Sequence, residues 1–245
     1  MMAFPFDTNP NEPTKLGLIV LSSDETIEDE FRAMLPKSCS LFQTRINSAP
    51  EVTPDTLMEM KAGLAASAAM IPPSFNVDVI GYACTSGATM IGPSNVATEV
   101  QKVHPNAQVC TPITAVMRAL NTLGAKKIGM VTPYIPDVSQ EMRNLLIENG
   151  FHISALVSFE VSTEAIVARI TADAIKRAVR AAAVDGADAV FVSCTNLRTV
   201  DVIDDLEDEL GIAIVTSNQA LAWDMLTSAG ISTAQSAVPG RLSKI

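Results

Sequence analysis

Two cysteines in matching sequence contexts are the residues of this chain best suited to chemistry. They end the segments Asp78-Val-Ile-Gly-Tyr-Ala-Cys84-Thr and Asp188-Ala-Val-Phe-Val-Ser-Cys194-Thr. A thiolate on one face of a carbon centre can accept a proton while a thiol on the opposite face donates one, which inverts the stereocentre. A thiolate can also add to an activated double bond, so that cis and trans alkenes interconvert. The pair therefore predicts two-thiol catalysis of one of these kinds.

Either reaction requires a thiol pKa below its usual value. Neither cysteine has a histidine beside it in the sequence, so we expect backbone amides and the N-terminus of the helix after each strand to stabilise the thiolate. The residues that follow are Thr85 and Ser86 in one case and Thr195 and Asn196 in the other. Such side chains can donate hydrogen bonds to a carboxylate or an oxyanion. The alternative interpretation is a pair of buried structural cysteines followed by ordinary helix caps.

The remaining cysteines and the histidines offer no second site. Cys39 and Cys110 have no matching partner, and we expect them to be structural. Widely spaced cysteines without a CxxC motif predict reduced thiols rather than disulfides. His104 and His152 are too few and too far apart for a multi-histidine metal site, so we expect no metal.

Composition excludes several classes of partner. The 245 residues carry 17 Lys and Arg against 27 Asp and Glu, a net charge of −10. An acidic chain without a basic run does not neutralise nucleic-acid phosphates, so we expect no nucleic-acid partner. No stretch approaches the roughly 18 consecutive apolar residues of a membrane span, and the first residues do not resemble a signal peptide. We therefore expect a cytoplasmic protein that does not bind membranes.

The elements that position the two cysteines alternate between apolar strands and amphipathic helices, as in βαβ units. Continuous apolar strands indicate a parallel sheet covered on both faces. The predicted strands cover residues 16–21, 40–46, 77–83, 108–110, 127–132, 152–158, 189–193 and 213–216. The clearest predicted helices cover 25–34, 54–70, 113–123, 139–149, 171–184 and 219–229.

An internal repeat organises these elements. Lys15-Leu-Gly-Leu-Ile-Val is echoed about 110 residues later by Lys127-Ile-Gly-Met-Val-Thr, the two cysteine segments lie the same distance apart, and 107–111 is echoed by 211–216. Chance recurrence of short strand motifs is the alternative explanation. The repeat predicts an α/β fold of two similar Rossmann-like parallel-sheet domains related by a pseudo-twofold axis. Ligands bind at the carboxyl ends of parallel strands, which places both cysteines at an active site in the cleft between the domains.

The predicted division gives a flexible tail and two domains. Residues 1–14 form the tail, residues 15–115 together with 215–245 form the first α/β domain, and residues 116–214 form the second. The oligomeric state is not determined by the sequence, and a homo-oligomer is compatible with it.

Four segments resemble the aspartate/glutamate racemase superfamily, and within it the branch of maleate cis-trans isomerase and arylmalonate decarboxylase. They are Lys15-Leu-Gly-Leu-Ile-Val-Leu-Ser-Ser-Asp-Glu-Thr, Gly81-Tyr-Ala-Cys84-Thr-Ser-Gly, Gly129-Met-Val-Thr-Pro-Tyr134 and Val192-Ser-Cys194-Thr-Asn-Leu-Arg-Thr. The first is also similar to the branch associated with ectoine utilisation. The resemblance implies two similar domains around a cleft, catalysis without a cofactor, and one catalytic cysteine from each domain, Cys84 and Cys194.

The resemblance also implies substrate-binding positions. Ser23 and Asp24 match a motif in which the family normally has Asn in place of Asp24, and Tyr134 matches a tyrosine whose hydroxyl approaches substrate. Thr85 and Ser86 would donate to a carboxylate or an oxyanion, and Thr195 and Asn196 follow the second cysteine. Glu164 falls where the isomerases usually carry Asn. The decarboxylases typically have Gly in place of Cys84, so retention of both cysteines favours a racemase or isomerase.

Asp24 and Glu164 put two acids where relatives hold a carboxylate with neutral amides. Two anions repel a dicarboxylate and favour a cationic group. Asp24 as a simple helix cap is the alternative interpretation. We therefore predict a cofactor-independent racemase or isomerase acting on a small carboxylate, with an amino-acid derivative as the substrate. The alternatives are a maleate cis-trans isomerase that uses thiolate addition, an arylmalonate-type decarboxylase, and a non-catalytic module that binds a small ligand.

Overall fold

Two parallel four-stranded sheets form the framework of the protein. The computed structural model describes residues 1–8, 12–184 and 186–245. The first sheet has the order β2-β1-β3-β4, with β1 (Thr14–Leu21), β2 (Cys39–Ile46), β3 (Val79–Ala83) and β4 (Gln108–Cys110). The second has the order β6-β5-β7-β8, with β5 (Lys127–Thr132), β6 (His152–Ser158), β7 (Ala189–Val192) and β8 (Ala213–Thr216). The equivalent strand orders confirm the predicted α/β fold of two similar domains.

Helices connect the strands in each half, as βαβ units require. In the first half these are α1 (Ile27–Met34), α2 (Pro54–Glu59), α3 (Leu64–Ala69), α4 (Thr85–Ile91), α5 (Pro93–Gln101) and α6 (Pro112–Thr122). In the second they are α7 (Pro136–Glu148), α8 (Glu164–Val167), α9 (Ala172–Ala182), α10 (Ile203–Leu210) and α11 (Ser217–Ser228). Short 3₁₀ segments are η1 (Met60–Gly63), η2 (Pro73–Phe75), η3 (Val200–Val202), η4 (Thr233–Gln235) and η5 (Arg241–Lys244).

The eight predicted strands are present with bounds that shift by two residues or fewer, whereas one predicted helix is broken. The segment 54–70 forms α2, the 3₁₀ turn η1 and α3 rather than a single helix. Gly63 ends η1, and glycine has a low helix propensity because it loses more backbone entropy than other residues.

Strands buried on both faces explain the apolar runs of the sequence. Every residue of β3, β7 and β8 is buried. Close packing against the helices restricts some of these positions to glycine. A Cβ at Gly129 of β5 would lie 2.2 Å from the carbonyl oxygen of Ala182 in α9. A side chain there would therefore separate the helix from the sheet.

Equivalent helices begin in the same way in the two halves. Thr111 caps α6 and Thr216 caps α11, and in each capping box the threonine side chain accepts from the backbone amide three residues later, of Thr114 or Gln219. These two caps are the structural counterparts of the 107–111 and 211–216 echo in the sequence.

Helix α11 joins the two halves. It follows β8 of the second sheet and packs against α6 and β3. A Cβ at Gly81 of β3 would lie 2.6 Å from the sulfur of Met225 in α11. The predicted boundaries at 115/116 and 214/215 fall within α6 and β8, and the division into residues 15–115 plus 215–245 and 116–214 stays a prediction.

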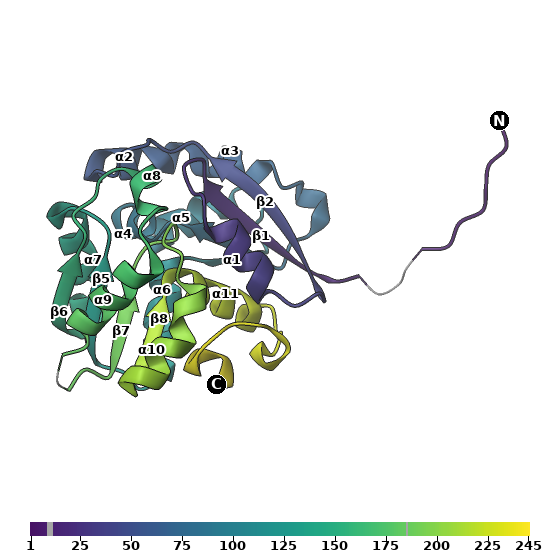
Figure 1. Ribbon diagram of the computed structural model, residues 1–245. Coiled ribbons are helices and arrows are strands. Elements are labelled where there is room, and N and C mark those ends of the chain that lie inside the picture. Colours follow the sequence, from purple (N-terminus) through teal and green to yellow (C-terminus); the bar gives the residue numbers. More distant parts are fainter. Residues whose placement is uncertain (9–11, 185) are drawn as a thin grey trace.

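The chain start extends away from the two sheets (Figure 1). Residues 1–8 are exposed and have no regular structure, and β1 begins at Thr14, inside the predicted tail 1–14. Residues 9–11 of that predicted tail lie outside the described residues. Across residues 1–8, 12–184 and 186–245, no helix combines the length and the apolar character needed to cross a membrane.

Candidate active site

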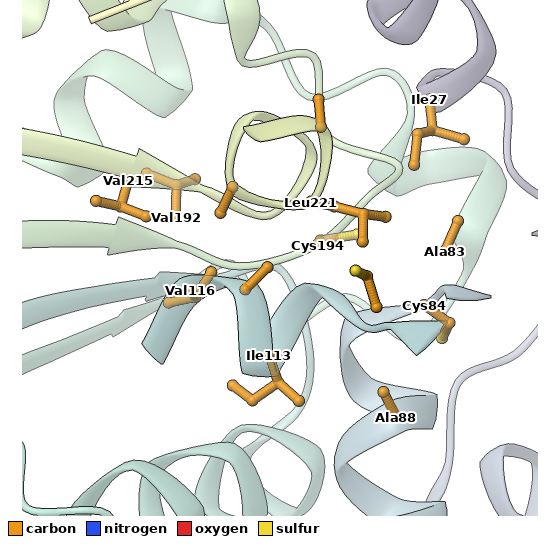
Figure 2. Close-up of a cluster of buried hydrophobic side chains, with 14 of the residues drawn as sticks. Ile27, Ala83, Cys84, Ala88, Ile113, Val116, Val192, Cys194, Val215 and Leu221 are labelled. Carbon is orange, nitrogen blue, oxygen red and sulfur yellow. The ribbon is translucent and has the colours of Figure 1, made fainter. Parts of the chain in front are cut away.

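The two cysteines lie at equivalent carboxyl ends of equivalent strands. Cys84 follows β3 directly, and Cys194 lies two residues after β7. Figure 2 shows both among buried apolar side chains such as Ile27, Ala83 and Leu221. Their exposed fractions are 2% for Cys84 and 1% for Cys194, so the thiols are closed off from bulk water.

Cys84 is the N-cap of α4. Its Sγ accepts from the backbone amide of Gly87 at 3.1 Å and lies 3.7 Å from the hydroxyl oxygen of Ser86. Burial raises the pKa of the Cys84 thiol to about 12, and the charges of Glu164 and Asp24 add to that rise. The Gly87 and Ser86 contacts act in the opposite direction because they stabilise the thiolate. The predicted role of a helix N-terminus therefore has a structural counterpart at Cys84.

Cys194 has a different local environment. Its φ angle is +118°, a region that residues with a side chain rarely adopt and one that often marks a functional site. The segment after Cys194 consists of turns, and the first helical turn there is η3, so the expected helix after this strand is absent. The backbone amide of Asn196 donates to the Cys194 Sγ at 3.2 Å, and the Tyr134 hydroxyl oxygen lies 3.0 Å from it. Burial, followed by the charge of Glu164, raises the Cys194 pKa well above its usual value.

Glu164 brings two of the predicted substrate-binding residues together. The Tyr134 hydroxyl donates to Oε1 at 3.0 Å, and the Asn196 side-chain amide donates to Oε2 at 2.7 Å. Glu164 has an exposed fraction of 3%, and burial raises its pKa while these two hydrogen bonds lower it. A carboxylate of the chain itself therefore occupies hydrogen-bond donors that would suit a substrate carboxylate.

Asp24 is both a helix cap and a buried acid beside the site. Its Oδ1 accepts from the backbone amides of Thr26 and Ile27, at the start of α1. Its Oδ2 is buried and has no hydrogen-bond partner among the described residues. Burial raises the pKa of Asp24, and its charge in turn raises the pKa of Cys84 and Glu164. The two interpretations made from the sequence are therefore compatible.

The other predicted binding residues make hydrogen bonds to neighbouring parts of the chain. The Ser23 hydroxyl pairs with the hydroxyl of Ser48 at 2.9 Å rather than with either cysteine. The Thr195 hydroxyl donates to the carbonyl of Ala83 at 3.3 Å, which ties the second cysteine segment to the end of β3. Thr85 donates from its hydroxyl to Ser217 at 2.8 Å.

Ser217 and its neighbour are residues that sequence reasoning missed. The Ser217 hydroxyl oxygen accepts both from Thr85 and from the backbone amide of Cys194, the latter at 3.0 Å. Asn218 donates its side-chain amide to the backbone carbonyl of Thr195 at 2.8 Å. Both follow β8, at the same sheet edge as Cys194, so polar residues after the fourth predicted strand were an available signal.

Cavity volumes show how closed this region is. The hollow lined by Glu164, Ser48 and Met60 has a volume of about 10 Å³, room for at most a single water molecule. A wider hollow of about 380 Å³ is lined by Asp78 and Gln108 at the amino ends of β3 and β4, opposite the cysteines. We place the candidate site at the cysteines, since parallel sheets bind ligands at the carboxyl ends of their strands.

Comparisons with known proteins agree with the two-domain α/β fold. Residues 38–243 match the family model described as arylmalonate decarboxylase. A maleate isomerase of Nocardia farcinica is 28% identical over 238 residues, which cover 92% of this chain and 93% of that protein. A maleate isomerase of Geobacillus stearothermophilus is 25% identical, covering 89% and 93%. A solved structure of the Nocardia farcinica enzyme, a cysteine-to-serine variant with a covalently bound succinylcysteine intermediate, superposes with a TM-score of 0.85 at 26% identity and covers 94% of this chain and 97% of that one.

Proposed function

Because the chain belongs to the arylmalonate decarboxylase family, we propose that it is a cofactor-independent isomerase in which Cys84 and Cys194 are the reacting pair. Both relatives above are maleate isomerases, and one of them forms a covalent succinylcysteine. In this chain the two thiols lie at equivalent strand ends. The Ser217 hydroxyl links the two cysteine segments, because its oxygen accepts from the Thr85 hydroxyl and from the backbone amide of Cys194. This arrangement supports a reaction that uses both thiols.

The substrate we propose has one carboxylate and one cationic group, as an amino-acid derivative does. The observation that carries this proposal is the carboxylate of Glu164, which already takes the hydrogen bonds of Tyr134 and Asn196. A second substrate carboxylate would compete with Glu164 for these donors and would be repelled by it. An ammonium group would instead be attracted to Glu164 and to the unpartnered Oδ2 of Asp24.

The pKa values of the thiols favour the same substrate. Glu164 and Asp24 both raise the pKa of Cys84 and of Cys194, in addition to the effect of burial. A cation between the acids and the thiols offsets that effect and brings thiolate formation closer to neutral pH. A dicarboxylate would raise the thiol pKa further. A cationic substrate group therefore assists the formation of the nucleophile or base.

The chemistry follows from the contacts of each thiol. One thiolate removes the proton next to the substrate carboxylate, and the other thiol protonates the opposite face. The amide of Gly87 stabilises the Cys84 thiolate, and the amide of Asn196 stabilises that of Cys194. For an unsaturated substrate the thiolate adds to the double bond, the adduct rotates about the resulting single bond, and elimination regenerates the thiolate.

The test is proton NMR of candidate acids incubated with the protein in deuterated water. The panel contains maleate, a disubstituted arylmalonate and α-amino acids with a second amino group. We expect loss of the α-proton signal in an amino-acid derivative, and no turnover of maleate. Replacing Cys84→Ser or Cys194→Ser should each lower the rate by about 10²–10⁴, the usual contribution of a positioned acid or base. The control Cys39→Ser, at a half-buried cysteine of β2, should leave the rate unchanged.

Other outcomes of the same experiment identify the alternatives. Turnover of maleate to fumarate at the rate of the best amino acid would overturn the cationic substrate and support maleate isomerisation, the activity of the two relatives. Loss of carbon dioxide from the arylmalonate would identify a decarboxylase. Ligand binding without any turnover, unchanged in both cysteine variants, would identify a non-catalytic binding module.

A further inference from the structure

Glu30 is a buried acid that the proposed reaction does not use. It lies on α1 with an exposed fraction of 8%. Its Oε1 accepts from the backbone amides of Thr199 at 2.6 Å and Val200 at 3.0 Å, and its Oε2 accepts from the Asn218 side-chain amide at 2.7 Å. Every one of these partners is a donor, so the contacts suit an ionised carboxylate.

Asn218 connects Glu30 to the second cysteine. Its Nδ2 donates both to Glu30 and, at 2.8 Å, to the backbone carbonyl of Thr195, the residue after Cys194. Glu30 therefore holds the segment 194–200 at both ends. It holds the end far from Cys194, at Thr199 and Val200, by direct hydrogen bonds. It holds the near end, at Thr195, through Asn218.

The oxygen atom of the Asn218 side-chain amide makes this link sensitive to protonation of Glu30. Its Oδ1 is buried and has no hydrogen-bond partner among the described residues. A proton on Glu30 Oε2 would face the Nδ2 donor, and a buried donor without an acceptor is costly. Rotation of the Asn218 amide would present Oδ1 to that proton, and Nδ2 would then leave the Thr195 carbonyl. A proton on Glu30 Oε2 that points at Asn218 and the hydrogen bond to Thr195 therefore exclude each other.

We propose that Glu30 is a positioning residue that holds the Cys194–Val200 segment through Thr199, Val200 and Asn218, and that protonation of Glu30 releases the near end of that segment. The connection to catalysis rests on the proposed function, in which Cys194 reacts, whereas the effect on the segment does not. The Asn196 amide and the Cys194 thiol that it contacts lie within the held segment.

Burial places the titration of Glu30 near neutral pH. Burial raises the pKa of Glu30 to about 7, against the effect of its three donors, and the charge of Asp24 contributes in the same direction as burial. The surface next to Glu30 also carries Asp29 of α1 together with Arg198 and Asp201 of the facing segment. At pH values above 7 the segment is held, and below 7 it is released.

The experiment is hydrogen exchange measured by mass spectrometry on the full chain between pH 5.5 and 8.5, corrected for the intrinsic exchange rate. For the wild type we expect the protection of peptides covering 195–200 against hydrogen exchange to fall by about tenfold as the pH falls through 7. This is the usual effect of one lost hydrogen bond. Glu30→Gln puts an amide donor in the place of Oε2 and requires the same Asn218 rotation. We therefore expect it to show low protection at every pH.

Glu207 supplies the matched control. It is also a buried acid that accepts from two backbone amides, those of Ile214 and Arg241, away from the cysteines. In Glu207→Gln, the hydrogen-exchange protection of the 195–200 peptides should depend on pH as it does in the wild type. Wild-type protection that does not change with pH would overturn the proposal without any variant. A loss of protection in Glu30→Gln that extends equally to the β1 and β5 peptides would also overturn the proposal, because that result indicates general destabilisation.

Catalysis provides an independent readout once a substrate is found. The pH profile of kcat in the wild type should fall on the acidic side near pH 7, and Glu30→Gln should lack that step. If the proposed function is wrong, no profile is obtained, yet the exchange result still decides the role of Glu30.

Discussion

Two buried acids support the proposed substrate at the scale of single side chains. Glu164 accepts from Tyr134 and Asn196, and Asp24 has a buried oxygen without a partner. Each acid raises the pKa of both cysteines, so the charge of the substrate decides how readily a thiolate forms. We propose that Asp24 and Glu164 together determine which substrate is accepted.

Exchanging these two acids for amides should change the preferred ligand. In the double variant Asp24→Asn with Glu164→Asn, we expect maleate to bind at least about tenfold more tightly, since a removed repulsion of one pKa unit corresponds to about 1.4 kcal/mol. Isothermal titration calorimetry with maleate measures this change. The exposed Asp205→Asn serves as the control and should have no effect. Equal maleate affinity in the wild type and the double variant would contradict the role of the two acids.

At the scale of elements, the two cysteines are held by different means. Cys84 caps α4 and accepts from the amide of Gly87, whereas Cys194 has φ +118° and is held by Ser217 and Asn196. The repeat of the sequence therefore extends to β3 and β7 but not to the segments that directly follow these two strands. Such a difference gives the two thiols distinct environments and allows one to act as base while the other acts as acid.

Gly87 provides a test of the α4 cap. A Cβ there would lie 2.8 Å from the Cys84 Sγ and 2.7 Å from the Tyr82 hydroxyl oxygen, so Gly87→Ala must displace the thiol. Alanine favours a helix interior over glycine by about 1 kcal/mol, which limits the loss of stability. We expect turnover to fall by about tenfold or more, in line with a misplaced catalytic group, while the melting temperature changes little.

The control for this substitution is Gly63→Ala. Its Cβ would meet only the Ile46 side chain, whose Cγ1 and Cδ1 atoms would lie at 3.3 and 3.4 Å. We expect normal turnover of that variant. Similar activity in Gly87→Ala and the wild type, measured with the substrate found by NMR, would argue against a catalytic Cys84.

At the scale of the whole molecule, the two halves share a helix. Helix α11 continues the chain from the second sheet, is buried over residues 217–226, and packs on α6 and β3 of the first half. Its first residue, Ser217, bonds to both cysteine segments. The relative position of the two thiols therefore depends on the packing between the halves.

This shared helix predicts that the halves unfold together. Leu221→Ala in α11 should destabilise the protein by about 2–5 kcal/mol, the range for a buried leucine. Trp223 is the single tryptophan and lies in the same helix, so its fluorescence reports on α11 while circular dichroism reports on all helices. For Leu221→Ala we expect the fluorescence and circular dichroism transitions to share one midpoint, at a lower urea concentration than in the wild type. Two separate transitions would show that the halves unfold independently.

The sequence was sufficient for the fold and the family. Its apolar runs predicted all eight strands, and its repeat predicted two similar domains, because the burial of parallel strands on both faces leaves a direct pattern in the sequence. The resemblance to the maleate cis-trans isomerase and arylmalonate decarboxylase branch is confirmed by the family match and by the relatives. The domain boundaries and the roles of the site residues stay predictions.

The tertiary structure alone decided the contacts around the second cysteine. No local pattern connects Glu164 with Tyr134 and Asn196, or Glu30 with Asn218 and Thr199, since the partners lie between 30 and 188 positions apart in the chain. The sequence determined which residues are apolar enough to be buried in each half. Which polar groups then met depended on the folding of the second half for Glu164 and on the packing between the halves for Glu30, because hydrogen bonds form between neighbours in space.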